Sequence, residues 1–91
     1  MAKQVNVCSD WNGNANENFD FVNHSTSAVT VDADGESTWP FSPAAPVTVP
    51  AKGPGGPGKL SMQILDLPDD TYPYNVDGCL TGGQAKSVTI P

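Results

Sequence analysis

The chain has 91 residues, a formal net charge of −6, nine Gly and nine Pro. This length predicts a single domain, residues 1–91, with a small hydrophobic core. The four Lys are scattered and there is no Arg, so we expect no nucleic-acid partner. No apolar run approaches the roughly 20 residues of a membrane-spanning helix. Abundant Val and Thr and few helix formers predict an all-β protein.

In the N-terminal half, polar and apolar residues alternate in three short segments, which predicts strands at residues 4–8, 19–23 and 28–32. The segment "SDWNGNANEN", residues 9–18, is rich in Asn and Gly and is expected to be a loop. Residues 23–28 are expected to connect the second and third strands as a hairpin.

In the C-terminal half, Pro interrupts residues 37–50, so their extended pieces should lie at sheet edges or between the sheets. "KGPGGPG", residues 52–58, is expected to be an exposed loop, and alternation returns at 60–65, 71–76 and 86–90. About seven strands, each with one apolar face, predict a two-sheet Greek-key β-sandwich. The expected core is Val5, Val7, Phe19, Phe21, Val29, Val31, Leu60, Met62, Ile64, Tyr72, Tyr74, Val76, Val88 and Ile90.

The two cysteines, Cys8 and Cys79, lie near opposite ends of the chain. An even number of cysteines in a short chain fits a disulfide formed in an oxidising compartment, and the alternative is two unrelated buried thiols. The disulfide interpretation implies an extracytoplasmic protein, periplasmic or secreted, whose export signal would already be removed.

Two stretches resemble the cupredoxins, the plastocyanin-like family. "FDFVNHSTSAVTVD" is similar to their aromatic strand that ends in Asn and leads into a Val-rich strand, and "DDTYPYNVDGC" with "KSVTIP" is similar to their closing hairpin. The resemblance covers residues 4–32 and 59–91 and implies a cupredoxin-like sandwich. It also implies that the end of the first strand and the copper-loop end of the closing hairpin share one pole, where Cys8 and Cys79 would be joined.

The copper ligands of that family do not match this chain. A blue-copper centre needs a thiolate, two imidazoles and usually a thioether. Val76 stands at the position of the family's Cys, and Cys79 stands at the position of its His. No Met follows in the loop, and the chain's one His is His24, on the turn before the expected position. The resemblance therefore implies the fold without copper, and we expect no cofactor.

Three other groups of residues are candidate sites. Trp11, Trp39 and Phe41 are aromatic residues in loops or broken strands, where they either contact a ligand or partner or plug the end of the sandwich. Asp32, Asp34 and Glu36 surround a Gly turn and form either a weak calcium site or an acidic hairpin turn. No catalytic residue is assigned, because one His among many Ser gives no Ser-His-Asp arrangement.

The sequence therefore predicts a small, extracytoplasmic, non-enzymatic binding or structural module, with an unidentified protein or small-molecule partner. One alternative is a metal-dependent electron-transfer protein with a nonstandard site at the closing hairpin, built from Cys79 and His24. Another is an immunoglobulin-like adhesion module with the same sandwich and a different strand order.

Overall fold

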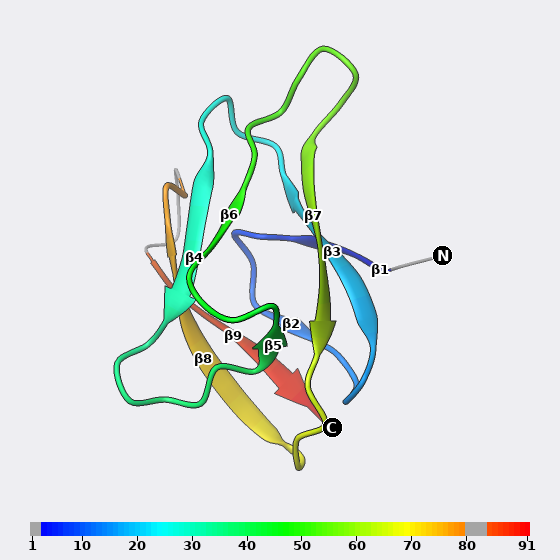
Figure 1. The fold of residues 1–91 in the computed structure, drawn as a ribbon, viewed down its shortest axis with the longest axis vertical. Coiled ribbons are helices and arrows are strands. Elements are labelled where there is room, and N and C mark those ends of the chain that lie inside the picture. Colours follow the sequence, from blue (N-terminus) through cyan, green and yellow to red (C-terminus); the bar gives the residue numbers. More distant parts are fainter. Residues whose placement is uncertain (1–2, 80–83) are drawn as a thin grey trace.

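The computed structural model describes residues 3–79 and 84–91 and contains two packed β-sheets. The first sheet has the strand order β1 (Lys3–Asn6), β3 (Asn18–Asn23), β7 (Gly58–Ile64) and β5 (Phe41–Ser42). The second has the order β2 (Trp11–Asn12), β9 (Ala85–Ile90), β8 (Asp70–Asp77), β4 (Val29–Ala33) and β6 (Val47–Val49). Figure 1 shows the two layers, with β4 and β8 on the left and β3 and β7 on the right.

The all-β prediction is confirmed as a two-sheet sandwich, since the described residues form strands and no helix. They form nine strands rather than about seven. The Pro-rich stretch contributes two short edge strands, β5 and β6, and β2 lies inside the segment 9–18, which the sequence analysis had expected to be a loop. β2 pairs in parallel with β9, and Trp11 lies opposite Val88. Because the two strands are far apart in sequence, no alternation of polar and apolar residues near Trp11 could have predicted this pairing.

The connection between β3 and β4 is not a hairpin, contrary to expectation. β3 pairs with β1 and β7 in the first sheet, whereas β4 pairs with β6 and β8 in the second. The chain therefore crosses between the layers at residues 24–28. The expectation failed because a short polar turn between two alternating segments fits both a hairpin and a crossing between sheets.

The core lies between the two sheets, where the inward faces of the strands meet. Every predicted core residue except Leu60 is buried, and Leu60 is half-buried against the same cluster. The core also contains four residues that were not predicted to be buried, Val22, Phe41, Val47 and Val49. The last three lie in a segment that several Pro residues interrupt. The alternation of apolar and polar residues there was too short to show which side chains face inward.

Two β-strand pairings are parallel and join segments far apart in sequence, β1 with β3 and β2 with β9. The segment between β1 and β2 passes from the first sheet to the second. Cys8 lies on this segment, and Cys79 lies just after β8. The fold therefore positions both cysteines where the two layers meet. No helix in the described part of the chain is long and apolar enough to cross a membrane.

Candidate functional site

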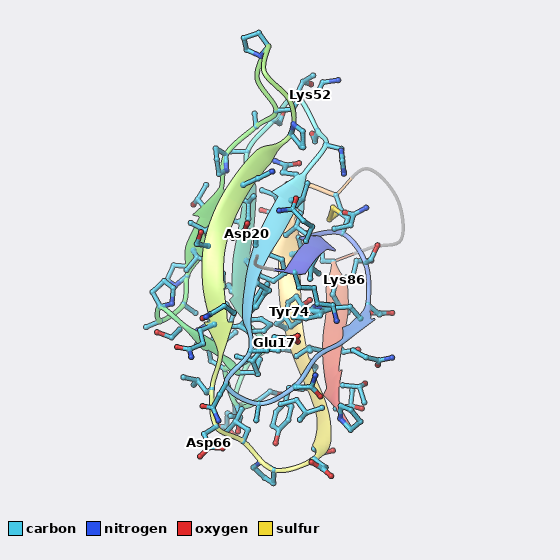
Figure 2. The ribbon with its side chains drawn as sticks, turned by 90° about the vertical axis from the view of Figure 1, so that its right-hand side faces the viewer. Glu17, Asp20, Lys52, Asp66, Tyr74 and Lys86 are labelled. Atoms are coloured by element: carbon cyan, nitrogen blue, oxygen red, sulfur yellow. A yellow bond between two sulfur atoms is a disulfide. The ribbon has the colours of Figure 1, made fainter. Side chains whose placement is uncertain are left out.

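A disulfide joins Cys8 to Cys79, with the Cα atoms 5.7 Å apart and a sequence separation of 71. It ties the segment after β1 to the end of β8, so it links the two sheets. Both cysteines are half-buried and pack against the core. Figure 2 shows the bridge as a yellow bond in the half of the molecule that carries Lys52, away from the end that carries Asp66.

Gly78 directs the chain from β8 into Cys79. Its backbone φ of 114° lies in a region that residues with a side chain rarely adopt. A Cβ built at this position would come 3.3 Å from the carbonyl oxygen of Ala28 and 3.4 Å from Cγ2 of Val29. The backbone conformation therefore favours glycine at this position, and a side chain would also fit tightly against Ala28 and Val29.

Asn23, the last residue of β3, is a buried polar side chain with an exposed fraction of 1%. Its Nδ2 donates to the carbonyl oxygens of Ser27 at 2.9 Å, Pro50 at 3.1 Å and Val49 at 3.4 Å. Its Oδ1 accepts a hydrogen bond from the backbone N–H of Ser25 at 2.9 Å. One side chain thus holds the crossing turn and attaches β3 to the chain that leaves β6.

A cavity of about 180 Å³ lies beside the bridge. It is lined by Asn6, Cys8, Asn23, His24, Ser25, Gly78 and Cys79. The described residues of the lining offer an imidazole, a hydroxyl, amides and sulfur, and none of them is a Lys, Asp or Glu. His24 is exposed to solvent on the turn that Asn23 holds. The arrangement can accept a small polar group or the tip of a partner, and it brings together His24 and Cys79, which the sequence analysis had named as a possible pair.

The positions at which the resembling family holds copper are differently occupied here. Val76 is fully buried in the core cluster, and Met62 is 4% exposed in the same cluster. The sulfur of Cys79 is bonded to Cys8. The described residues contain no group of three or more His, Cys, Asp or Glu side chains placed to hold a metal ion.

The aromatic candidates lie together around Phe41. The ring centroids of Trp39 and Trp11 lie 5.3 Å and 6.2 Å from that of Phe41. Phe41 has an exposed fraction of 1%, so its ring does not reach the surface. Both Trp are half-buried and pack against the core, so only these two have a surface that a partner could touch.

Hydrogen bonds fix both indole groups. Trp39 Nε1 donates to the carbonyl oxygen of Pro43 at 3.0 Å, and Trp11 Nε1 donates to the hydroxyl of Tyr74 at 2.9 Å. Burial raises the pKa of Tyr74 far above its ordinary value, the hydrogen bond from Trp11 lowers it, and the charge of Asp10 raises it further. These contacts place the rings where packing and polar bonding both restrain them, as expected for residues that plug a sandwich.

The acidic turn holds its own backbone and a neighbouring strand. The backbone N–H of Ser37 donates to the carbonyl oxygen of Asp34, and Gly35 has a φ of 56°. Asp34 Oδ1 accepts from Asn75 Nδ2 at 3.3 Å, and Asp32 Oδ1 accepts from the N–H of Ala33 at 2.7 Å. The carboxylates of Asp32, Asp34 and Glu36 do not form a group that could hold a metal ion.

Asn23 is one of the residues of this site that were not among the candidates predicted from the sequence. The sequence does indicate that Asn23 is buried. It follows Phe19 and Phe21 at a spacing of two, which puts all three side chains on the same face of β3. An Asn on the inward face of a strand needs hydrogen-bond partners inside the protein. Those partners, on residues 27, 49 and 50, come from segments that only the fold brings close.

Comparisons of the chain with family models, with curated proteins and with solved structures found no match.

Proposed function

We propose that this chain is a small, extracytoplasmic, non-enzymatic binding or structural module, with a cupredoxin-like Greek-key sandwich and no copper centre. One observation supports the proposal above the others: the sulfur of Cys79 is bonded to Cys8. The residue at the position of the family's thiolate is Val76, which lies in the core. A soft metal therefore has no free thiolate at this pole, and the pole is closed by a covalent link.

The cupredoxin-like interpretation rests on the resemblance together with the position of the bridge. The resemblance implies that the end of the first strand and the closing hairpin share a pole. Cys8 follows β1 by two residues and Cys79 follows β8 by two residues, and their Cα atoms lie 5.7 Å apart. This adjacency supports the cupredoxin-like strand order over the immunoglobulin-like alternative.

An extracytoplasmic location is proposed because the two cysteines form a disulfide and are half-buried rather than sealed inside the core. Such a bridge is accessible to cellular reductants and persists best where the surroundings are oxidising. The cavity beside the bridge and the exposed parts of Trp11 and Trp39 are the two surfaces on which a protein or small-molecule partner would bind.

The electron-transfer alternative is supported by one observation: His24 and Cys79 line the same cavity. Thiol titration and absorption spectroscopy distinguish the two functions. We expect no free thiol in the purified, denatured protein and two after reduction. We also expect no intense blue thiolate-to-copper absorption when Cu²⁺ is added to the oxidised protein. A stable blue species with one copper per chain would reject the proposed module and establish the electron-transfer function.

A further inference from the structure

A positive charge lies over the ring of Trp11. The Nζ atom of Lys3 is 5.4 Å from the ring centroid, within the roughly 6 Å over which an indole attracts a cation. The same Nζ donates to the carbonyl oxygen of Asn12 at 2.6 Å. We propose that the Trp11 ring and the Asn12 carbonyl form a binding site for a lysine side chain of a partner protein, and that Lys3 occupies this site in the free chain. The inference rests on the proposed function, because it assigns a partner to one of the two binding surfaces.

Packing and hydrogen bonding fix the Trp11 ring, so the site is formed before a partner arrives. The ring centroid lies 4.7 Å from that of Phe19 and 6.2 Å from that of Phe41, whose plane is tilted by only 14°. The indole Nε1 donates to the hydroxyl of Tyr74 at 2.9 Å. Phe19 and Phe41 are buried, whereas Lys3 is exposed. The ammonium group therefore marks the side of the ring that faces the solvent.

The second group of the site is a carbonyl oxygen at the edge of a sheet. In the described part of the chain, β2 is the outermost strand of the second sheet. The N–H of Gly13 donates to the carbonyl oxygen of Thr89 in β9 at 3.0 Å. The carbonyl of Asn12 belongs to the same peptide group as this N–H, and in a trans peptide the two bonds point in opposite directions. The Asn12 oxygen therefore points away from β9, toward the open edge, where an ammonium group can reach it.

Lys3 is an occupant that a partner can replace. Its main chain pairs with Phe19 at the start of β1, so the backbone is held by the first sheet. Its side chain is exposed, and both of its ammonium contacts are with uncharged groups. Such contacts are weak at an exposed position. The side chain can therefore rotate into solvent, and another ammonium group can take its place without movement of either sheet.

Trp39 shows that a half-buried indole in this chain does not by itself hold a cation. Its ring packs against Phe41 and its Nε1 donates to the carbonyl oxygen of Pro43. Among the described residues, however, a cation lies over the ring of Trp11 and none lies over that of Trp39. The chain has a formal net charge of −6, which attracts a basic partner. The Trp11 face is thus the aromatic surface suited to a lysine.

Lys3 competes with the partner because it belongs to the same chain. A partner binds only while the site is empty, so its apparent affinity is reduced by the fraction of chains in which Lys3 has left the ring. Removal of the Lys3 ammonium should therefore strengthen binding of an external lysine, whereas removal of the indole should weaken it. These two changes have opposite signs, which separates a binding site from a contact that only stabilises the fold.

The test uses the intact, oxidised, isotope-labelled chain and follows the indole N–H signals of Trp11 and Trp39 by NMR. The probe is the peptide acetyl-Gly-Lys-Gly-amide, and the control probe is the same peptide with an acetylated, uncharged lysine. The Lys3→Ala chain should bind the charged peptide with a saturable shift of the Trp11 signal and no shift of the Trp39 signal. Its affinity should exceed that of the wild type by about threefold or more. The acetylated peptide should not bind.

Two further variants are made in the Lys3→Ala chain. Trp11→Phe should weaken binding by about threefold or more, because Trp attracts a cation better than Phe. Trp39→Phe is the matched control, since Trp39 is also half-buried, and its affinity should equal that of Lys3→Ala. Circular dichroism checks that each variant is folded. If Trp11→Phe does not fold, the comparison of Lys3→Ala with the wild type decides.

Three outcomes would overturn the proposal. The first is an equal affinity of the Lys3→Ala and wild-type chains for the charged peptide, and the second is equal binding of the charged and acetylated peptides. The third is binding of choline without binding of the lysine peptide, which would assign the site to a small-molecule ammonium instead of a partner protein. The thiol and copper measurements that test the proposed function do not involve Trp11, so the two proposals can fail separately.

Discussion

The two ends of β7 lie in regions of the molecule that different forces hold together. At one end, Gly58 pairs with Asn23, and this region is fixed by the disulfide and by the buried amide of Asn23. At the other end, Ile64 pairs with Phe41, and this region is fixed by packed rings. The bridged end has a cavity whose lining includes the side chains of Asn6, Asn23, His24 and Ser25, whereas the aromatic end holds packed rings.

This difference shows two ways in which a 91-residue domain can hold its two sheets together. Packed rings exclude water and leave little room for a ligand, but they stabilise without special partners. The bridged end lacks such packed rings. The disulfide and the buried amide of Asn23, whose polar atoms are hydrogen-bonded, stabilise it instead. We therefore expect the bridged end to be sensitive to loss of single bonds, and the aromatic end to be sensitive to loss of volume.

The largest effect should come from removal of the bridge. The double variant Cys8→Ser, Cys79→Ser should lose about 4 kcal/mol of unfolding free energy, because the bridge closes a long loop and restricts the unfolded chain. Urea unfolding of the variant and of the oxidised wild type measures the difference. A loss below about 1 kcal/mol would show that the bridge does not stabilise the sandwich.

Replacement of the buried amide should have the second-largest effect. Asn23→Ala leaves the carbonyl oxygens of Ser27, Val49 and Pro50 without this donor, and we expect a loss of about 3 kcal/mol. Asn18→Ala in the same strand is the control, because Asn18 is exposed and its loss should be under about 0.5 kcal/mol. Equal losses in the two variants would contradict the role assigned to Asn23.

At the aromatic end, Trp39→Ala should cost about 2 kcal/mol. This is less than for a fully buried ring, because Trp39 is half-buried, but the change removes its contact with Phe41 and its hydrogen bond to Pro43. Chemical unfolding monitored by circular dichroism measures the loss. If stability instead stays within about 0.5 kcal/mol of the wild type, Trp39 is a surface residue, and its exposed part becomes the better candidate for partner contact.

The smallest effect concerns pH. Burial raises the pKa of Tyr74 in the folded chain above its unfolded value of 10.0, so the folded state keeps the phenol proton that the unfolded state releases. Stability from this group is complete below pH 10 and falls as pH rises above it, by up to about 1.4 kcal/mol per pH unit. Urea unfolding at pH 9, 10 and 11 tests the prediction, and a Tyr74→Phe variant should lose this dependence. A wild-type stability that rises with pH over this interval would refute it.

Much of the fold could be predicted from the sequence because strands with one buried face have a period of two. Residues 19–23 and 71–76 show this pattern clearly, and the structure buries Phe19, Phe21 and Tyr74 as expected. The Pro-rich stretch gave too little alternation to place Phe41, Val47 and Val49. At the site, the pairing of Cys8 with Cys79 was expected from the resemblance, but the hydrogen bonds of Asn23 were not.

The sequence by itself determined the all-β class, most of the strands and their inward faces, since these depend on the local alternation of apolar and polar side chains. Only the tertiary structure decided the partners. It put β3 and β4 in different sheets, paired Trp11 with β9, and aligned three carbonyl oxygens on Asn23. The physical reason is that pairing between strands and satisfaction of buried polar groups depend on segments distant in sequence, and a local pattern contains no information about which segments will meet.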